Sequence, residues 1–213
     1  MSLPGDARYA VYFAPEDDSA LARFGEAWLA RPEAGEGPPH YGFHATLKAP
    51  FRLADGYATR DLVSALDSFA RRVAPFVGPC LRLDALDGFL ALRPAQPSPS
   101  LDGLAERCLR SFDCFRAPPT AAELARRLEA PLDERERELL ARWGYPYVLE
   151  RYRFHLTLTD RLDSRGQLAT RLLLAPLTAP LEREPLAVRS VCLFVQAAPG
   201  EPFALRQRFA LAG

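Results

Sequence analysis

The chain has 213 residues, and 48% of them are hydrophobic, which is enough to build the core of one large domain or of two joined lobes. Lys and Arg together number 27, as do Asp and Glu, so bulk charge does not favour a long nucleic-acid backbone as the partner. No apolar run approaches the roughly 20 residues of a membrane helix, and residues 1–6 do not resemble a signal peptide. We therefore expect a cytoplasmic protein without membrane contact, whose four cysteines are free thiols.

The first half of the chain predicts strands that alternate with helices. The predicted elements are, in order, a strand at 8–13, a helix from about 15, a strand at 41–48, a helix from Thr59 and a hairpin over 81–92. The hairpin turns about Asp87-Gly88, a dipeptide that favours the tight turns between antiparallel strands.

The second half repeats this order after a different segment. A Pro/Ser linker at 94–100 leads to helical patterning at about 100–143. The elements predicted after it are a strand at about 151–160, a helix at about 164–175, and strands at about 186–197 and 203–210. We therefore expect one bilobal, pseudo-duplicated domain over 1–213, in which the lobes are allowed to exchange strands. Its expected parts are lobe one at about 8–93, a helical insertion at about 100–143 and lobe two at about 150–213.

The same short pattern, Phe-His-x-Thr-Leu, begins once in each half, at Phe43 and at Phe154. Side chains alternate between the two faces of a strand, so residues two apart point the same way. In the first strand the residues expected on one face are His44, Thr46 and Lys48. In the second strand they are Arg151, Arg153, His155, Thr157 and Thr159. Each half therefore presents a titratable imidazole beside a hydroxyl.

Two histidines on separate strands suit acid–base catalysis at a phosphorus atom. A neutral imidazole accepts a proton from the attacking oxygen and an imidazolium protonates the leaving oxygen, each contributing about a hundred- to ten-thousandfold in rate. We predict that His44 and His155 hold these roles. The residues expected to bind the phosphate of the substrate are Thr46, Thr157, Lys48, Arg153, Arg151 and Tyr12. No carboxylate or thiolate cluster accompanies the histidines, so we expect neither a metal nor a cofactor.

The paired motifs His44-Ala45-Thr46 and His155-Leu156-Thr157 resemble those of the two-histidine (2H) phosphoesterase superfamily. That superfamily includes 2′–5′ RNA ligase-like proteins and cyclic nucleotide phosphodiesterases. Together with residues 8–13 and 41–51, the motifs are similar to a branch associated with phosphonate-utilisation operons. The resemblance implies an α+β fold whose mainly antiparallel central sheets form a concave groove, with helices outside. It also implies metal-independent opening or formation of a phosphodiester, with the two histidines as acid and base.

We therefore expect a cyclic phosphodiesterase that acts on a small phosphorylated sugar or nucleotide, such as a ribose cyclic phosphate from phosphonate breakdown. Two alternatives stay open, namely an RNA 2′–5′ or 2′,3′-cyclic phosphodiesterase or ligase, and a non-catalytic module that binds a phosphorylated metabolite. The balanced charge counts against RNA. A matched acid–base pair counts against binding alone, because binding does not require it. The segment at 100–143 exceeds what a minimal member of the superfamily requires, and whether it caps the groove stays open.

Overall fold

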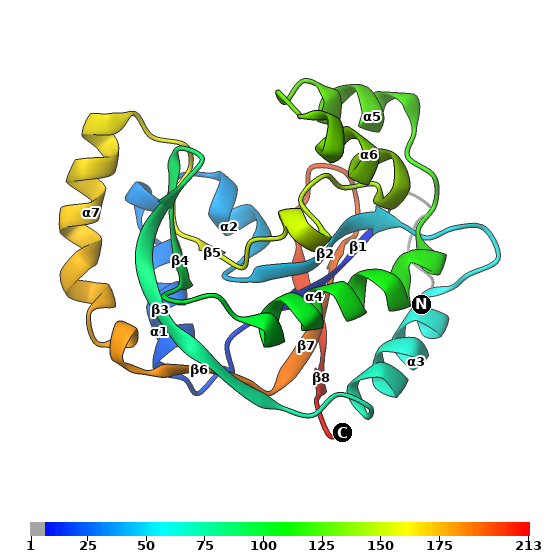
Figure 1. The fold of residues 1–213 in the computed structure, drawn as a ribbon, viewed down its shortest axis with the longest axis horizontal. Helices are drawn as coiled ribbons and strands as arrows, with labels where there is room; N and C mark the ends of the chain where they lie inside the picture. The colour runs from blue at the N-terminus through cyan, green and yellow to red at the C-terminus, as the bar shows by residue number, and fades with distance from the viewer. Residues whose placement is uncertain (1–6) are drawn as a thin grey trace.

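The computed structural model describes residues 7–213, which form two antiparallel sheets with helices around them (Figure 1). The strands are β1 (Arg8–Phe13), β2 (Ala45–Arg52), β3 (Phe76–Leu86), β4 (Phe89–Pro94), β5 (Leu156–Thr157), β6 (Pro185–Val188), β7 (Ser190–Gln196) and β8 (Ala204–Ala210). The α-helices are α1 (Ala20–Leu29), α2 (Gly37–Tyr41), α3 (Thr59–Ala70), α4 (Pro99–Phe112), α5 (Ala121–Leu128), α6 (Glu134–Trp143) and α7 (Ser164–Thr178). The 3₁₀ turns are η1 (Pro32–Ala34), η2 (Asp113–Phe115), η3 (Leu149–Arg151) and η4 (Leu181–Arg183). The predicted α+β class is confirmed. None of the helices in this part of the chain combines the length and apolar character needed to cross a bilayer.

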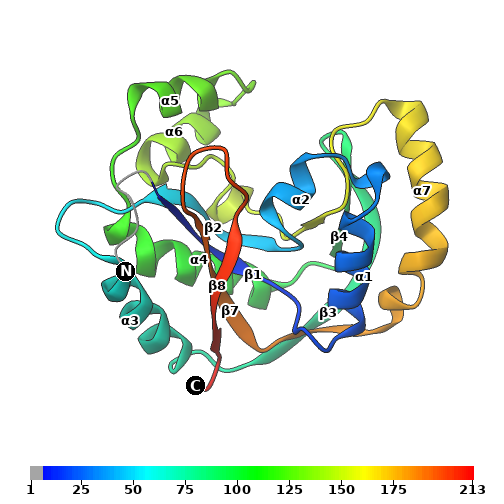
Figure 2. The same cartoon turned by 180° about the vertical axis from the view of Figure 1, so that it is seen from behind.

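The first sheet has the strand order β2-β1-β7-β8 and joins the two N-terminal strands to the two C-terminal ones. All neighbouring strands in it are antiparallel. The central strands β1 and β7 are almost wholly buried, as their continuous apolar sequences predict. Figure 2 shows β7 and β8 beside β1, with the C-terminus near α3. There the amide of Ala212 donates to the carbonyl of Ala70 (3.1 Å), which ties the C-terminal residues to the end of α3.

The second sheet has the order β5-β4-β3-β6 and contains the predicted hairpin. Leu86 at the end of β3 lies opposite Phe89 at the start of β4, so Asp87 and Gly88 alone form the turn. Their φ angles are 47° and 94°, as a type I′ turn requires at both central positions. The hairpin predicted from the Asp-Gly dipeptide is confirmed.

The two halves of the chain exchange strands. The single strand predicted over 186–197 is interrupted at Arg189: β6 before it pairs with β3, whereas β7 after it pairs with β1. Each sheet therefore contains strands from both halves. The strands that carry the two motifs, β2 and β5, occupy the same position, the edge of their respective sheets.

The predicted helical segment at about 100–143 is helical, but it is not a single unit. The helix α4 belongs to the main core and buries residues that include Leu101, Cys108 and Phe112. By contrast, α5 buries none of its residues, and α6 buries only Leu139 and Leu140. In Figure 1 these two helices stand above β2, away from α7. Only the second part of the segment therefore projects from the core. All four cysteines are free, as predicted.

The second motif strand is much shorter than predicted. Instead of 151–160, only Leu156 and Thr157 form a strand, and residues 149–151 form η3. Hydrogen bonds outside the ladder hold the following residues against β4 and α1. The amide of Leu90 donates to Thr159 Oγ1 (3.0 Å), and the indole N–H of Trp28 donates to the carbonyl of Leu158 (2.7 Å). Because these bonds fix the chain just past β5, two paired residues are enough to place the second histidine.

Candidate active site

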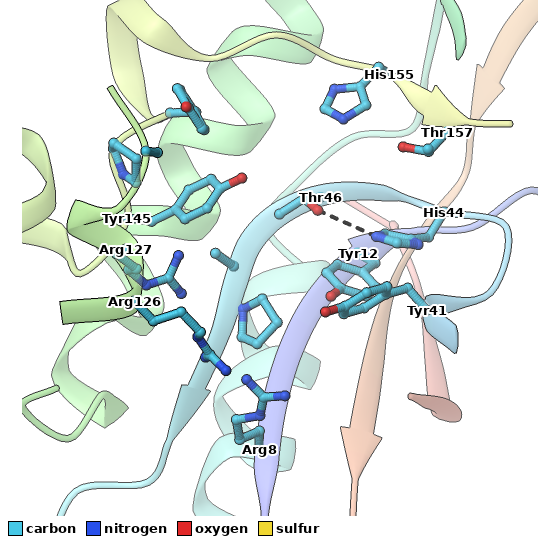
Figure 3. Close-up of a pocket in the computed structure, with 15 residues that line it drawn as sticks. Arg8, Tyr12, Tyr41, His44, Thr46, Arg126, Arg127, Tyr145, His155 and Thr157 are labelled. Atoms are coloured by element: carbon cyan, nitrogen blue, oxygen red, sulfur yellow. Dashed lines mark hydrogen bonds between the residues drawn. The ribbon is translucent and has the colours of Figure 1, made fainter. Parts of the chain in front are cut away.

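A pocket of about 450 Å³ lies between β2, β5 and the projecting helices (Figure 3). His44, Thr46, His155 and Thr157 all line it, so the fold brings the two distant motifs into one site. Its volume falls in the range of about 300–1,000 Å³ that small-molecule sites occupy.

The imidazole of His44 is fixed by one hydrogen bond and one aromatic contact. Its Nδ1–H donates to the carbonyl of Gly42 (2.8 Å), and the ring of Tyr12 stacks on it with centroids 3.8 Å apart and an interplanar angle of 21°. A carbonyl can only accept, so Nδ1 carries the proton and the lone pair of Nε2 remains available. The hydroxyl of Thr46 lies 3.4 Å from that Nε2.

His155 repeats this arrangement in the other half of the chain. Its Nδ1–H donates to the carbonyl of Arg153 (2.6 Å), which is again two residues earlier. Its ring lies 5.6 Å from that of Phe89, and the side chain is half-buried. The same tautomer is thereby selected, so both histidines present an Nε2 lone pair to the same pocket.

The environment keeps both imidazoles neutral in the free protein at pH 7. Burial lowers the pKa of His44 to about 4, an effect that the bond to Gly42 opposes and the nearby His155 reinforces. Burial also lowers the pKa of His155, against the raising effect of its bond to the Arg153 carbonyl. A bound phosphate anion would stabilise an imidazolium and raise these pKa values, so protonation of one ring is coupled to the arrival of substrate.

The phenylalanine before each histidine anchors the motif in the core. Phe43 packs so tightly on α1 that a Cβ at Gly25 would lie 2.0 Å from its ring. Phe154 is buried and lies 5.6 Å from the ring of Phe13. These contacts explain why an aromatic residue adjoins a catalytic candidate in both copies.

The expectation that Lys48 shares the face of His44 and Thr46 is wrong. The pairing of β2 with β1 shifts register between Thr46 and Lys48, and such a bulge breaks the alternation of side chains. Lys48 is only 2% exposed, and its ammonium lies 3.0 Å from Asp113 Oδ1, a carboxylate that Arg116 also contacts (2.8 Å). It therefore ties β2 to the end of α4 and does not line the pocket.

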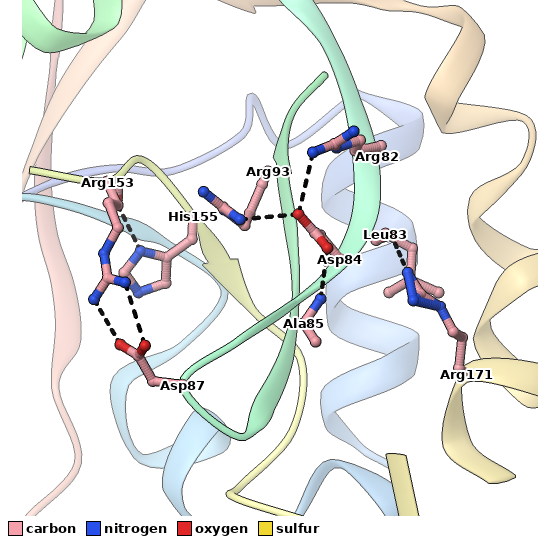
Figure 4. A network of polar contacts seen from close by, with 9 residues as sticks. All are labelled: Arg82, Leu83, Asp84, Ala85, Asp87, Arg93, Arg153, His155 and Arg171. Carbon is pink, nitrogen blue, oxygen red and sulfur yellow. Dashed lines mark hydrogen bonds and ion pairs between the residues drawn. The ribbon is translucent and has the colours of Figure 1, made fainter. Parts of the chain in front are cut away.

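The two arginines predicted from the second motif also lie outside this pocket. Arg151 sits in η3 and pairs with Asp133 (2.6 Å), because the chain turns there instead of running as a strand. Arg153 pairs with Asp87 at the hairpin turn (2.6 and 3.3 Å; Figure 4). Its backbone carbonyl accepts from His155, and its side chain lines an adjoining cavity of about 120 Å³ together with Thr46 and His155. Tyr12 does line the pocket, where its observed contact is the stack on His44.

The structure adds pocket residues that the motif analysis did not identify. They are Arg8 from β1, Arg126 and Arg127 from α5, and the aromatic residues Tyr41, Tyr145 and Tyr147. No local pattern separates these arginines from the others in the chain, since only the position of α5 over β2 brings them to the site. Within residues 7–213, the His, Cys, Asp and Glu side chains form no group of three placed to hold a metal ion.

The chain shares its fold with a solved structure of a phosphoesterase. A solved structure described as the crystal structure of a phosphoesterase aligns over 100% of both chains, with a TM-score of 0.50 and 16% identity. An identity this low is evidence for a shared fold only. The fold expected from the resemblance to the two-histidine phosphoesterases is confirmed.

A family model described as "Protein of unknown function (DUF1045)" matches residues 46–204, and the chain belongs to this family. A relative from Janthinobacterium sp. (strain Marseille), named ribose 1,5-bisphosphate phosphokinase PhnN, is 38% identical over 231 aligned residues, which cover 97% of this chain and 51% of the relative. A protein of the same name from Laribacter hongkongensis (strain HLHK9) is 40% identical over 174 residues, covering 73% of this chain and 40% of that protein. The chain thus spans about half the length of the curated relatives it matches, or less.

Proposed function

We propose that this protein is a metal-independent phosphodiesterase that opens the cyclic phosphate of a small sugar or nucleotide. The observation that carries the proposal is the pair of imidazoles in one pocket, each with Nδ1–H bound to the carbonyl two residues earlier, which leaves Nε2 unprotonated. The Nε2 of His44 lies 3.4 Å from the Thr46 hydroxyl. Two such groups supply the base and the acid that in-line displacement at phosphorus requires.

The reaction assigned to these groups is hydrolysis of one bond of the ring. One imidazole accepts a proton from water as the water oxygen bonds to phosphorus, while the opposite imidazolium donates a proton to the departing ring oxygen. The bond between phosphorus and that oxygen breaks, which leaves a phosphomonoester and a free hydroxyl. The hydroxyls of Thr46 and Thr157 would donate hydrogen bonds to the non-bridging oxygens as their negative charge increases.

Two observations favour a small substrate connected with phosphonate metabolism. Arg126 and Arg127 of the helix α5 form one wall of the pocket, and this wall would obstruct a long RNA strand. The name of the two curated relatives refers to a doubly phosphorylated pentose, which supports a pentose phosphate as the substrate class.

The phosphokinase activity in that name is not part of the proposal. Lys48 is the single lysine of the chain and follows Leu47, so the chain has no phosphate-binding loop in which a lysine follows glycine. Moreover, this lysine is buried against Asp113.

The test is a panel of 2′,3′-cyclic nucleotides and ribose 1,2-cyclic phosphates in buffer containing EDTA, with product phosphomonoester followed by ³¹P NMR. We expect turnover by the wild type and a loss of at least about a hundredfold in His44→Ala/His155→Ala. The control is His40→Ala, which removes the one histidine that does not line the pocket and should leave turnover intact. Wild-type turnover by the double variant would contradict the proposal, and saturable binding of these esters without turnover would instead indicate a binding module.

A further inference from the structure

We infer that the same pocket holds a second anion subsite, in which Arg8, Arg126 and Arg127 bind a phosphomonoester group of the substrate that is separate from the cyclic phosphate. This inference rests on the proposed function, because it specifies what else the substrate of that reaction carries. It makes the substrate class a sugar that bears a cyclic phosphate and a distal phosphomonoester.

The first observation is that these arginines have no carboxylate partner. No Asp or Glu lines the pocket, and within residues 7–213 none of the three guanidinium groups forms an ion pair. Arg8 instead donates from Nε to the neutral side chain of Gln196 (2.6 Å). In a chain with equal numbers of acidic and basic residues, this pocket is a local excess of positive charge.

The neighbouring acidic group is already engaged elsewhere. Glu123 on α5 accepts from Arg52 (3.2 Å) and from the amide of Thr120 (2.7 Å), where it closes the capping box at the start of the helix. Burial raises the pKa of Glu123, but these bonds outweigh it and lower the pKa to about 2. The carboxylate is therefore ionised at neutral pH and bound to these two partners. Its hydrogen bonds are therefore directed at Arg52 and the helix terminus, and not at the pocket.

The second observation is that the like charges converge. In Figure 3 the side chains of Arg126 and Arg8 extend toward one another from opposite walls, with Arg127 beside them. Burial lowers the pKa of Arg127, Tyr145 and Glu123 oppose this effect, and the charges of Arg126 and Arg8 add to it. Arg127 also lies over the ring of Tyr145, 5.1 Å from its centroid, which restrains its direction. Converging guanidinium groups that form no ion pair with a carboxylate are the arrangement that a phosphate dianion stabilises, through bidentate hydrogen bonds.

The arginines and the catalytic groups occupy different parts of the one pocket. In Figure 3 the arginines lie across the pocket from His155 and Thr157, and Tyr145 stands between the two sets. A pentose that carries a cyclic phosphate and a phosphomonoester on its far carbon would place the first near the histidines and the second near the arginines. The projecting helix α5 would thus determine specificity, while β2 and β5 supply the chemistry.

The kinetic test compares ribose 1,2-cyclic phosphate with and without a 5-phosphate. We expect the wild type to prefer the 5-phosphorylated compound by at least about tenfold in kcat/KM, because charge-assisted bonds to the second phosphate add to its binding. The Arg126→Gln/Arg127→Gln variant should reduce this ratio to near one. The matched control is Arg137→Gln on α6, an exposed arginine without an ion pair within residues 7–213, which should keep the wild-type ratio.

A binding measurement separates the failure of this inference from the failure of the proposed function. Titration calorimetry of ribose 5-phosphate with His44→Ala/His155→Ala requires no turnover. We expect saturable binding that weakens at least about tenfold when Arg126→Gln/Arg127→Gln is added. Equal turnover of both cyclic compounds, together with binding insensitive to the arginines, would overturn the subsite and leave the catalytic proposal standing. Faster turnover of an oligonucleotide ending in a 2′,3′-cyclic phosphate than of its mononucleotide would also overturn it, since the arginines would then serve an RNA backbone.

Discussion

The two copies of the motif orient their histidines in the same way on very different supports. His44 precedes the eight-residue strand β2 and is stacked on Tyr12, whereas His155 precedes the two-residue strand β5. In both, however, the imidazole donates to the carbonyl two residues earlier. The ring orientation is therefore local to the motif, and the surrounding structure decides how firmly each ring is held and how its pKa is shifted.

The second copy of the motif is held in place mainly by side-chain contacts, whereas the first is held by the pairing of its strand. Figure 4 shows Arg153 bound to Asp87 at the hairpin turn, with His155 bound to the backbone of the same arginine. Thr159 adds a bond to the amide of Leu90 on β4 (3.0 Å). In the first copy, as far as residues 7–213 show, no ion pair holds the residue before the histidine. There β2 is held by its pairing with β1 and by the ion pair of Lys48 with Asp113.

The largest effect is expected when each histidine is replaced alone, which tests whether the two copies of the motif are equally required for turnover. If one is the acid and the other the base, His44→Gln and His155→Gln should each lower kcat by about a hundred- to ten-thousandfold. The double variant should lose little more than the worse single variant, because the groups act as a unit. Steady-state kinetics on the best cyclic phosphate measures this. A single variant with near wild-type kcat would show that the motifs are not equivalent.

The pH dependence of the free energy of unfolding should show how strongly the surroundings of His44 shift its pKa. The pKa of His44 is about 4 in the folded protein and about 6.5 when unfolded, so the unfolded state takes up a proton first as the pH falls. The free energy of unfolding should therefore fall by up to about 2 kcal/mol between pH 7 and 5 from this residue alone. Urea denaturation at the two pH values should show a smaller fall in His44→Gln than in the wild type. An identical fall in both proteins would contradict the buried, neutral state of His44.

The tether of the second copy can be weakened without altering its turn. Asp87→Asn keeps a residue that tolerates the positive φ of 47°, and Asn-Gly suits a type I′ turn, but the charge that holds Arg153 is lost. We expect about a tenfold loss in kcat from looser placement of His155, with a displaced pH profile and an unchanged melting temperature. The control is Asp67→Asn, which breaks the exposed pair with Arg71 on α3. Equal effects of the two substitutions would refute the role of this tether.

The smallest effect is expected at the aromatic contact of the first copy. Tyr12→Phe keeps the stacked ring and should change kcat/KM by less than about threefold, whereas Tyr12→Leu removes the stack and should lower it about fivefold. The pH–rate profile of the leucine variant should move only on the limb that reports His44. A fivefold loss in Tyr12→Phe would instead assign a role to the hydroxyl.

Part of the site could be predicted because it depends on short-range geometry. The turn at Asp87-Gly88 follows from the φ angles that each residue type adopts, and the roles predicted for His44 and His155 follow from a motif repeated in matching surroundings. The prediction for Lys48 was wrong because a bulge in β2 interrupts the alternation on which it relied. That for Arg151 was wrong because the chain forms a 3₁₀ turn before β5. Both irregularities arise from pairing with distant residues, and no local pattern signals them.

Residue chemistry and periodicity along the chain were enough to predict the α+β class, the two histidines with their neighbouring threonines, and the free cysteines. Only the tertiary structure decided that the halves exchange strands at Arg189 and that both Nε2 atoms face one pocket. It also decided that Arg8, Arg126 and Arg127 converge there. The reason is that Arg8 lies more than a hundred residues before Arg126 and Arg127. Their charges act on the same ligand only when packing brings β1 and α5 to the same pocket.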